Sequence, residues 1–64
     1  MRTMRVADRN SGKIELIREN DRRFQVELRI VADRNDLTID AAIKAMDDGQ
    51  ALMTVGFVRS FDRE

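Results

Sequence analysis

The 64-residue chain contains neither cysteine nor histidine, and this absence limits both how it can fold and what chemistry it can perform. Without cysteine no disulfide can staple the fold, and without either residue nearly every zinc site is excluded. Ser-His-Asp and Cys-His catalysis and thiol redox chemistry are excluded on the same ground. Stability has to come from an apolar core, from oxygen-ligated metal or from association with a partner.

A core of this size leaves a small margin of stability. The area scaling laws suggest that a 7.4 kDa chain buries roughly 6,500 Å² on folding. If about 60% of that area is apolar, its burial contributes about 100 kcal/mol at 25 cal/mol per Å². Ordering 64 residues at about 1.5 kcal/mol each costs about the same. We therefore expect one domain spanning residues 1–64, stabilised further by forming a homodimer.

The overall charge of the chain favours no class of charged partner. Twelve basic residues balance twelve acidic ones, so the net charge is zero and attracts neither nucleic acid nor an anionic membrane. No apolar run approaches the 18 residues that a membrane span needs. The first five residues also lack the apolar stretch of a signal peptide, which makes the cytoplasm the expected location.

The first half of the chain has the alternating pattern of β-strands. Between Arg23 and Asp33, polar residues alternate with the apolar residues Phe24, Val26, Leu28 and Ile30, as in a half-buried strand. Two further strands are predicted at Thr3–Asp8 and Lys13–Glu19. Tight turns are expected at residues 10–13 and 20–22, which contain the Asn, Gly and Asp typical of turns.

After Asp33 the apolar spacing changes to that of a helix. The residues that follow the i, i+3, i+4, i+7 rule are Ile39, Ala42, Ile43 and Met46. Thr38 suits the N-cap, and Gly49 suits the left-handed position past the C-terminus. We predict a helix from Ile39 to Asp48 and a last strand from Ala51 to Phe61.

These elements predict a small α+β domain with the order β-β-β-α-β. A single helix between two strands normally makes a right-handed crossover to a parallel strand. The expected result is a four-stranded mixed sheet with one helix packed on one face.

The second face of this sheet is the predicted partner surface. The side chains expected to point inward are Met4, Val6, Ile14, Leu16, Phe24, Val26, Leu28, Ile30, Met53, Val55 and Phe57. The opposite face then carries Ile17, Val31, Leu52 and Val58 with nothing to cover them. A contiguous apolar patch on a small monomer usually marks a partner site, although single exposed apolar residues are ordinary. We interpret these four residues as a self-association or partner face.

Two groups of charged residues are candidate polar contacts for a partner. Arg18, Arg22 and Arg23 cluster around the second turn, where they could bind phosphates or an acidic protein, or simply be solvated. Asp47 and Asp48 lie at the unfavourable end of the predicted helix dipole. Such a local conflict indicates either a partner-facing site or a salt bridge to a nearby arginine.

No residue is assigned to catalysis, to a cofactor or to a metal. Residues 8–19 place oxygen ligands at positions 1, 3 and 12 of a calcium loop, but the glycine falls at position 5 instead of 6. The flanking segments also have strand patterns, so we interpret this stretch as a hairpin turn. The three scattered glycines form no phosphate-binding loop.

Taken together, these features favour a non-enzymatic protein-binding module that self-associates and also binds another protein. By analogy of size and class alone, it resembles phage- or plasmid-borne accessory factors, including inhibitors of host proteins. One alternative is a small nucleic-acid-binding protein or transcriptional regulator that uses the arginines of the second turn. Another is a small-ligand binder or carboxylate enzyme with its site at a subunit interface.

Overall fold

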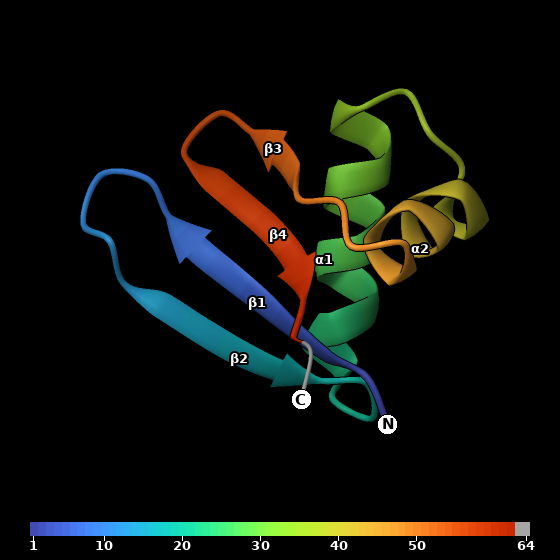
Figure 1. Ribbon diagram of the computed structural model, residues 1–64, viewed down its shortest axis with the longest axis horizontal. Coiled ribbons are helices and arrows are strands. Elements are labelled where there is room, and N and C mark those ends of the chain that lie inside the picture. The colour runs from blue at the N-terminus through green and yellow to red at the C-terminus, as the bar shows by residue number, and fades with distance from the viewer. Residues whose placement is uncertain (63–64) are drawn as a thin grey trace.

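Six elements follow one another in a computed structural model that describes residues 1–62. They are β1 (Thr3–Asp8), β2 (Ile14–Arg18), α1 (Arg22–Arg34), α2 (Ile39–Asp47), β3 (Leu52–Thr54) and β4 (Phe57–Phe61). The strands form one sheet in the order β2-β1-β4-β3, and every neighbouring pair is antiparallel. The two hairpins therefore meet along β1 and β4 in the middle of the sheet (Figure 1).

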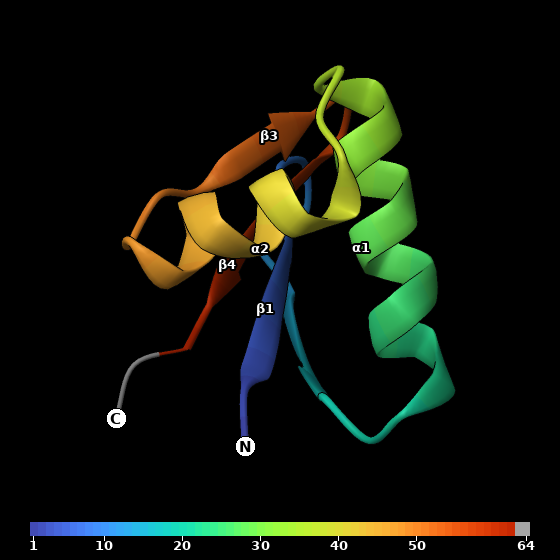
Figure 2. The same cartoon turned by 90° about the vertical axis from the view of Figure 1, so that its right-hand side faces the viewer.

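Both helices lie on the same side of the sheet (Figures 1 and 2). α1 contacts β2 and β3, and α2 packs beside α1 over β3 and β4. The protein thus has two layers, one of helices and one of strands. Within residues 1–62, no helix or strand lies over the opposite face of the sheet, which we call the open face (Figure 1).

The α+β class is confirmed, but the predicted order β-β-β-α-β is wrong. The observed order is β-β-α-α-β-β, with two helices and a fully antiparallel sheet. The segment predicted as a single last strand turns back on itself at Val55–Gly56, where Gly56 has a φ of 93°. Because this segment forms a hairpin, no parallel crossover is needed and the sheet is not mixed.

The largest difference from the predicted fold is that residues 22–34 form helix α1 instead of a strand. Two periods coexist in this segment. Phe24, Val26, Leu28 and Ile30 alternate, but Phe24, Leu28, Val31 and Ala32 also satisfy the i, i+4, i+7, i+8 rule of a helix face. The second set is the one that is buried.

Local signals at both ends favour the helix. At its start, the Asp21 carboxylate accepts a hydrogen bond from the backbone N–H of Arg23 at 2.9 Å, which is an N-cap. At its end, Asp36 adopts a left-handed φ of 55°, and the N–H of Leu37 donates to the carbonyl of Ala32 at 2.9 Å. This is a Schellman motif built on aspartate instead of glycine.

α2 lies where the sequence places it, ending at Asp47, one residue short of the predicted end. The Thr38 hydroxyl accepts from the N–H of Ala41 at 3.1 Å, so the predicted N-cap is confirmed. Gly49 has a φ of 94°, and the N–H of Gln50 donates to the carbonyl of Ala45 at 3.0 Å. The predicted left-handed glycine is therefore confirmed as well.

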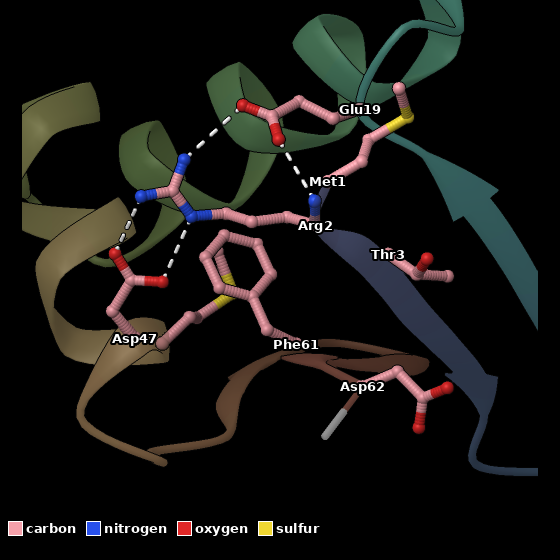
Figure 3. Close-up of a pocket in the computed structure, with 8 residues that line it drawn as sticks. Met1, Arg2, Thr3, Glu19, Asp47, Phe61 and Asp62 are labelled. Atoms are coloured by element: carbon pink, nitrogen blue, oxygen red, sulfur yellow. Dashed lines mark hydrogen bonds and ion pairs between the residues drawn. The ribbon is translucent and has the colours of Figure 1, made fainter. Parts of the chain in front are cut away.

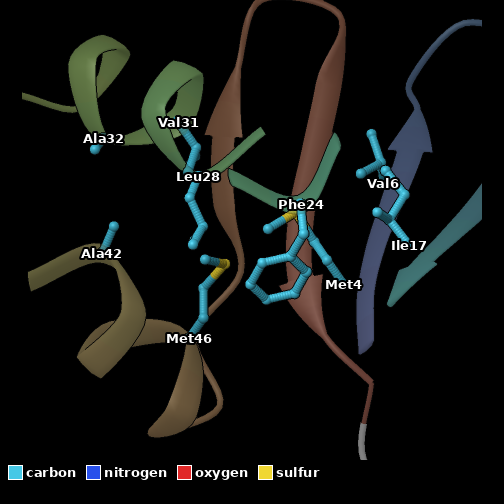
Figure 4. Packing of buried hydrophobic residues seen from close by; sticks show 9 residues of the cluster. All are labelled: Met4, Val6, Ile17, Phe24, Leu28, Val31, Ala32, Ala42 and Met46. Carbon is cyan, nitrogen blue, oxygen red and sulfur yellow. The ribbon is translucent and has the colours of Figure 1, made fainter. Parts of the chain in front are cut away.

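The core fills the space between the helices and the inner face of the sheet (Figure 4). Its buried members are Met4, Val6, Ile17, Phe24, Leu28, Val31, Ala32, Ala42 and Met46. Phe24 of α1 also stacks on Phe61 of β4, with ring centroids 5.8 Å apart and an interplanar angle of 14°. Stacked aromatic pairs at this spacing contribute beyond the area that they bury.

Replacing Leu28 by Ala is expected to destabilise the protein by about 2–5 kcal/mol, because the side chain is fully buried and its removal leaves a cavity. Val26→Ala is the matched control. Val26 alternates with Leu28 in a strand but is 52% exposed on the helix, so its truncation should change stability by less than about 0.5 kcal/mol. Chemical denaturation measures both, and equal losses at the two positions would contradict the helix.

Replacing Thr38 by Ala is expected to cost about 1 kcal/mol, because the N–H of Ala41 loses its acceptor. Thr38→Ser keeps the hydroxyl and should retain most of the stability. Thermal unfolding of the two variants checks this, and an equal melting temperature for both would show that the cap does not stabilise α2.

Candidate functional site

The open face of the sheet carries a continuous row of apolar side chains. Cross-strand pairing places one residue of each strand in register along this row, which consists of Ile14, Ala7, Val58 and Met53 in the order β2-β1-β4-β3. We call these four residues the apolar row. Leu16 lies on the same face, two positions along β2 from Ile14. The apolar surface therefore crosses all four strands.

These side chains are accessible to a partner. Ile14, Leu16 and Met53 are 52%, 58% and 59% exposed, whereas a core side chain such as Met4 is fully buried. Val55, in the turn between β3 and β4, is 88% exposed. Large apolar residues that share one uncovered face differ from the scattered exposed residues that every protein has.

The predicted partner face has the wrong membership. Ile17 and Val31 are 3% and 0% exposed and belong to the core. Leu52 packs against the core from the inner side, opposite Arg59. Of the four predicted residues, Val58 alone lies on the open face. The second face of the sheet does carry apolar residues, but apart from Val58 they are not the residues that we predicted.

The error comes from the orientation of β2. The pairing of β2 with β1 puts Ile17 opposite the inward Met4 and puts Ile14 opposite the outward Ala7. Because side chains alternate along a strand, a shift of one residue exchanges its two faces. Ile14 and Leu16 therefore point away from the helices. Glu15 takes an inner position, where Arg23 of α1 pairs with it.

Five other residues predicted to point inward are also exposed, because they lie in elements that differ from the predicted strands or at their ends. They are Val26, Ile30, Met53, Val55 and Phe57. Val26 and Ile30 lie on the outer side of α1, at 52% and 37% exposure, because the helix turns them away from the stripe that contains Leu28. Met53 belongs to the apolar row, and Val55 lies in the tight turn. Phe57 points inward at the end of β4 but remains 40% exposed, beyond the cover of the helices.

The structure does not bring the three arginines of the second turn together. Arg18 lies on the open face, in the row that also contains Thr3. Arg22 begins α1 and is exposed. Arg23 pairs with Glu15 and with Glu27, and its pKa is raised, first by the hydrogen bond to Glu15. A shared phosphate site at this turn therefore has no geometric basis.

A buried ion pair ties α1 to the sheet. The Arg59 Nε donates to Glu27 Oε2 at 3.0 Å, and Arg59 Nη2 lies 2.9 Å from the same oxygen. The two side chains are only 4% and 11% exposed. Arg59 Nη1 also donates to the Thr54 hydroxyl at 3.0 Å, and its guanidinium lies 5.6 Å from the Phe57 ring centroid. Glu27 and Arg59 are charged, so the apolar periodicity that predicts buried positions does not include them. This buried pair is therefore not predicted from the sequence.

A polar corner of about 520 Å³ lies beside the N-terminus (Figure 3). Arg2 extends across it. Its Nε and Nη2 donate to the two oxygens of Asp47 at 2.9 Å each, and its Nη1 donates to Glu19 at 3.2 Å. The guanidinium also lies 5.7 Å from the Phe61 ring centroid.

This corner explains why aspartate is tolerated at the end of α2. Asp47 forms a bidentate pair with Arg2, which offsets the unfavourable dipole. The salt-bridge interpretation is therefore the one that the geometry supports. Asp48 is the exposed C-cap residue. Because Arg2 already donates to two carboxylates, its guanidinium is engaged within the protein.

Another acidic side chain, Asp8, has a structural role in a turn. The Asp8 carboxylate accepts the N–H groups of Asn10 and Ser11, and these bonds lower its pKa. It thus closes the β1–β2 turn. Among residues 1–62, no three carboxylates come close enough to hold a metal ion. No helix in this part of the chain is long and apolar enough to cross a membrane.

Comparison of the chain with models of known protein families, with curated proteins and with solved structures finds no match.

Removing one partner of the buried pair is expected to be costly. Glu27→Ala leaves the Arg59 guanidinium buried without its carboxylate and should destabilise the protein by about 3 kcal/mol. The double variant Glu27→Leu, Arg59→Met replaces both charges and should be more stable than Glu27→Ala. Urea denaturation checks this, and additive losses in a double-mutant cycle would contradict the coupling.

The Arg2 corner predicts a loss of stability in acid. The N–H of Arg2, and then its guanidinium charge, lower the pKa of Glu19 below its ordinary value. A carboxylate with a lowered folded-state pKa contributes stability above its unfolded pKa of about 4.3 and loses that contribution as pH falls through the folded value. The melting temperatures of wild type and Glu19→Gln should therefore differ most at neutral pH and converge in acid. A difference independent of pH would contradict the interaction.

Proposed function

We propose that this protein is a non-catalytic protein-binding module and that its binding surface is the open face of the sheet. The observation that supports this most directly is the apolar row, which crosses all four strands of a face that no element covers. An antiparallel sheet with one solvated face ordinarily carries polar residues there. Here that alternation is incomplete, because water also contacts isoleucine, leucine and methionine on a face that carries Arg5 and Arg18.

The charges at one end of the open face indicate how a partner is oriented. Beyond the apolar row, the next positions on β1 and β2 are Arg5 and Leu16, followed by Thr3 and Arg18. Arg5 contacts Asp62 at 3.5 Å, while no carboxylate within residues 1–62 pairs with Arg18. An apolar centre with a polar, mainly basic margin is the usual anatomy of a protein interface.

Two features argue against the alternative functions. In the polar corner the donors of Arg2 are engaged by Glu19 and Asp47, so they do not converge on open space as the polar groups of a ligand site do. The three arginines that could bind nucleic acid point to different surfaces, and the net charge of the chain is zero.

Capture from cells that produce the protein tests the proposal. Met53→Glu places a charge in the centre of an apolar contact, where burial leaves the carboxylate unpaired. The tagged variant should lose the proteins that wild type retains. Val26→Glu is the matched control, because Val26 is exposed to a similar degree on α1, away from the open face. If both variants retain the same proteins, the open face is not the binding surface.

A direct assay tests the nucleic-acid alternative. Labelled duplex DNA and single-stranded RNA should show no measurable binding to the purified protein at 50 mM salt, since Arg18, Arg22 and Arg23 do not form one surface and the net charge is zero. Affinity that falls steeply as salt is raised would contradict our proposal and favour nucleic-acid binding, because counterion release produces that dependence.

A further inference from the structure

We infer that the open face binds a second copy of this chain, in a face-to-face dimer whose twofold axis runs parallel to the strands. This inference rests on the proposed function, since it names the occupant of the same surface. The inference follows from how the residues are arranged on that face. One half-turn places apolar residues of one copy against apolar residues of the other.

The rotation brings the apolar row onto itself. A half-turn about an axis parallel to the strands and lying between the two sheets exchanges β2 with β3 and β1 with β4. Ile14 then faces Met53 of the second copy, and Ala7 faces Val58. Sheets that pack in this aligned way lie about 10 Å apart, which side chains of this size bridge.

The neighbouring rows are also compatible with this arrangement. Arg5 comes to lie over the Ser60 hydroxyl of the second copy. Leu16 falls beyond Ser60, opposite the segment that precedes β3, because β3 begins only at Leu52. Leu16 therefore lies over a part of the second sheet that is only three strands wide, beside β4 and before the start of β3.

The charges at the end of the face are complementary. Thr3 separates Arg18 on one side from Asp62 on the other, since the N–H of Asp62 donates to the carbonyl of Thr3 at 2.7 Å. After the rotation, Arg18 of each copy lies about one strand spacing, roughly 4.8 Å, to the side of the other copy's Asp62. A long arginine side chain can span that offset. Each copy therefore offers Asp62, which already contacts Arg5 of its own chain, to an arginine with which no carboxylate of residues 1–62 pairs.

Other ways of joining two copies fit the residues less well. A half-turn about an axis across the strands stacks each strand on its own copy. It either places the apolar row on itself, away from Leu16, or brings the row of Arg5 or that of Arg18 over the apolar row. Pairing of the β2 edges uses free main-chain groups but leaves the apolar row in water. The outer side of α1 offers only Val26 and Ile30 as large apolar residues.

The size of the face predicts a reversible dimer. Four short strands and three rows of side chains provide less area than the roughly 800 Å² per partner of a standard stable interface. We therefore expect dissociation in the micromolar range and a melting temperature that rises with protein concentration.

Sedimentation equilibrium measures this dimer directly. Wild type should dimerise, and Met53→Glu should raise the dissociation constant by about 100-fold or more, because the charge loses its hydration on burial. Val26→Glu should leave it unchanged. A wild-type monomer at about 100 µM, with a melting temperature independent of concentration, would overturn the inference.

Cross-linking determines the orientation, and the absence of native cysteine makes the experiment clean. Ile14→Cys and Met53→Cys alter exposed side chains only, so both variants should fold. With a short bismaleimide, a mixture of the two proteins should give a covalent dimer, while neither should do so alone. Self-cross-linking of Ile14→Cys, or of Leu16→Cys as a third variant, would show that β2 lies on or beside β2 and would overturn the proposed axis.

The outcomes separate this inference from the proposed function. If wild type stays monomeric but Met53→Glu still abolishes capture of a different protein, the open face remains a binding surface and the second copy is not its occupant. If Met53→Glu affects neither self-association nor capture, both proposals fail.

Discussion

The structure depends on one stripe of apolar side chains along α1. Phe24, Leu28 and Val31 face the sheet from successive turns of the helix, and each is almost completely buried. Phe24 continues into the sheet through its stack on Phe61, and Phe61 in turn lies beside the guanidinium of Arg2. Helix α1, strand β4 and the polar corner are therefore connected by successive contacts of Phe24, Phe61 and Arg2. The described residues 1–62 share this one apolar core and no disulfide reinforces it, so a defect in the stripe affects the whole of that core.

Charged side chains add specificity to this small core. Glu27 and Arg59 pair at the interface of α1 with the sheet, and Arg23 extends the network to Glu15 on β2. Buried pairs of this kind contribute little net stability relative to apolar residues, but breaking one partner is costly. The contact with Glu15 is itself half exposed, so it adds only a weak preference for the orientation of β2 in which Glu15 faces the helices. Burial of Ile17 opposite Met4 is the stronger reason why Ile14 and Leu16 face water.

Two helices on one side leave the other side of the sheet bare, and this asymmetry is the basis of the proposed binding function. The apolar row is produced by register alone, because one residue from each strand falls in line across the sheet. The same register makes the face self-complementary when a half-turn parallel to the strands exchanges β2 with β3. A second helical layer, which a longer chain of this type could supply, would serve the same physical need that we assign to a second copy.

The sequence by itself determined the α+β class, the first two strands and α2 with its Thr38 cap and Gly49 terminus, because turns, caps and short periodic segments depend on neighbouring residues. It also indicated that one face of a sheet would remain apolar and uncovered. Tertiary structure decided the rest. Residues 22–34 satisfy both a strand and a helix period, and packing of Leu28 and Val31 on the sheet selects the helix. The outward face of β2 carries two large apolar residues, Ile14 and Leu16, and the inward face carries one, Ile17. Pairing of Ile17 with Met4 and of Ile14 with Ala7 determines which face is buried.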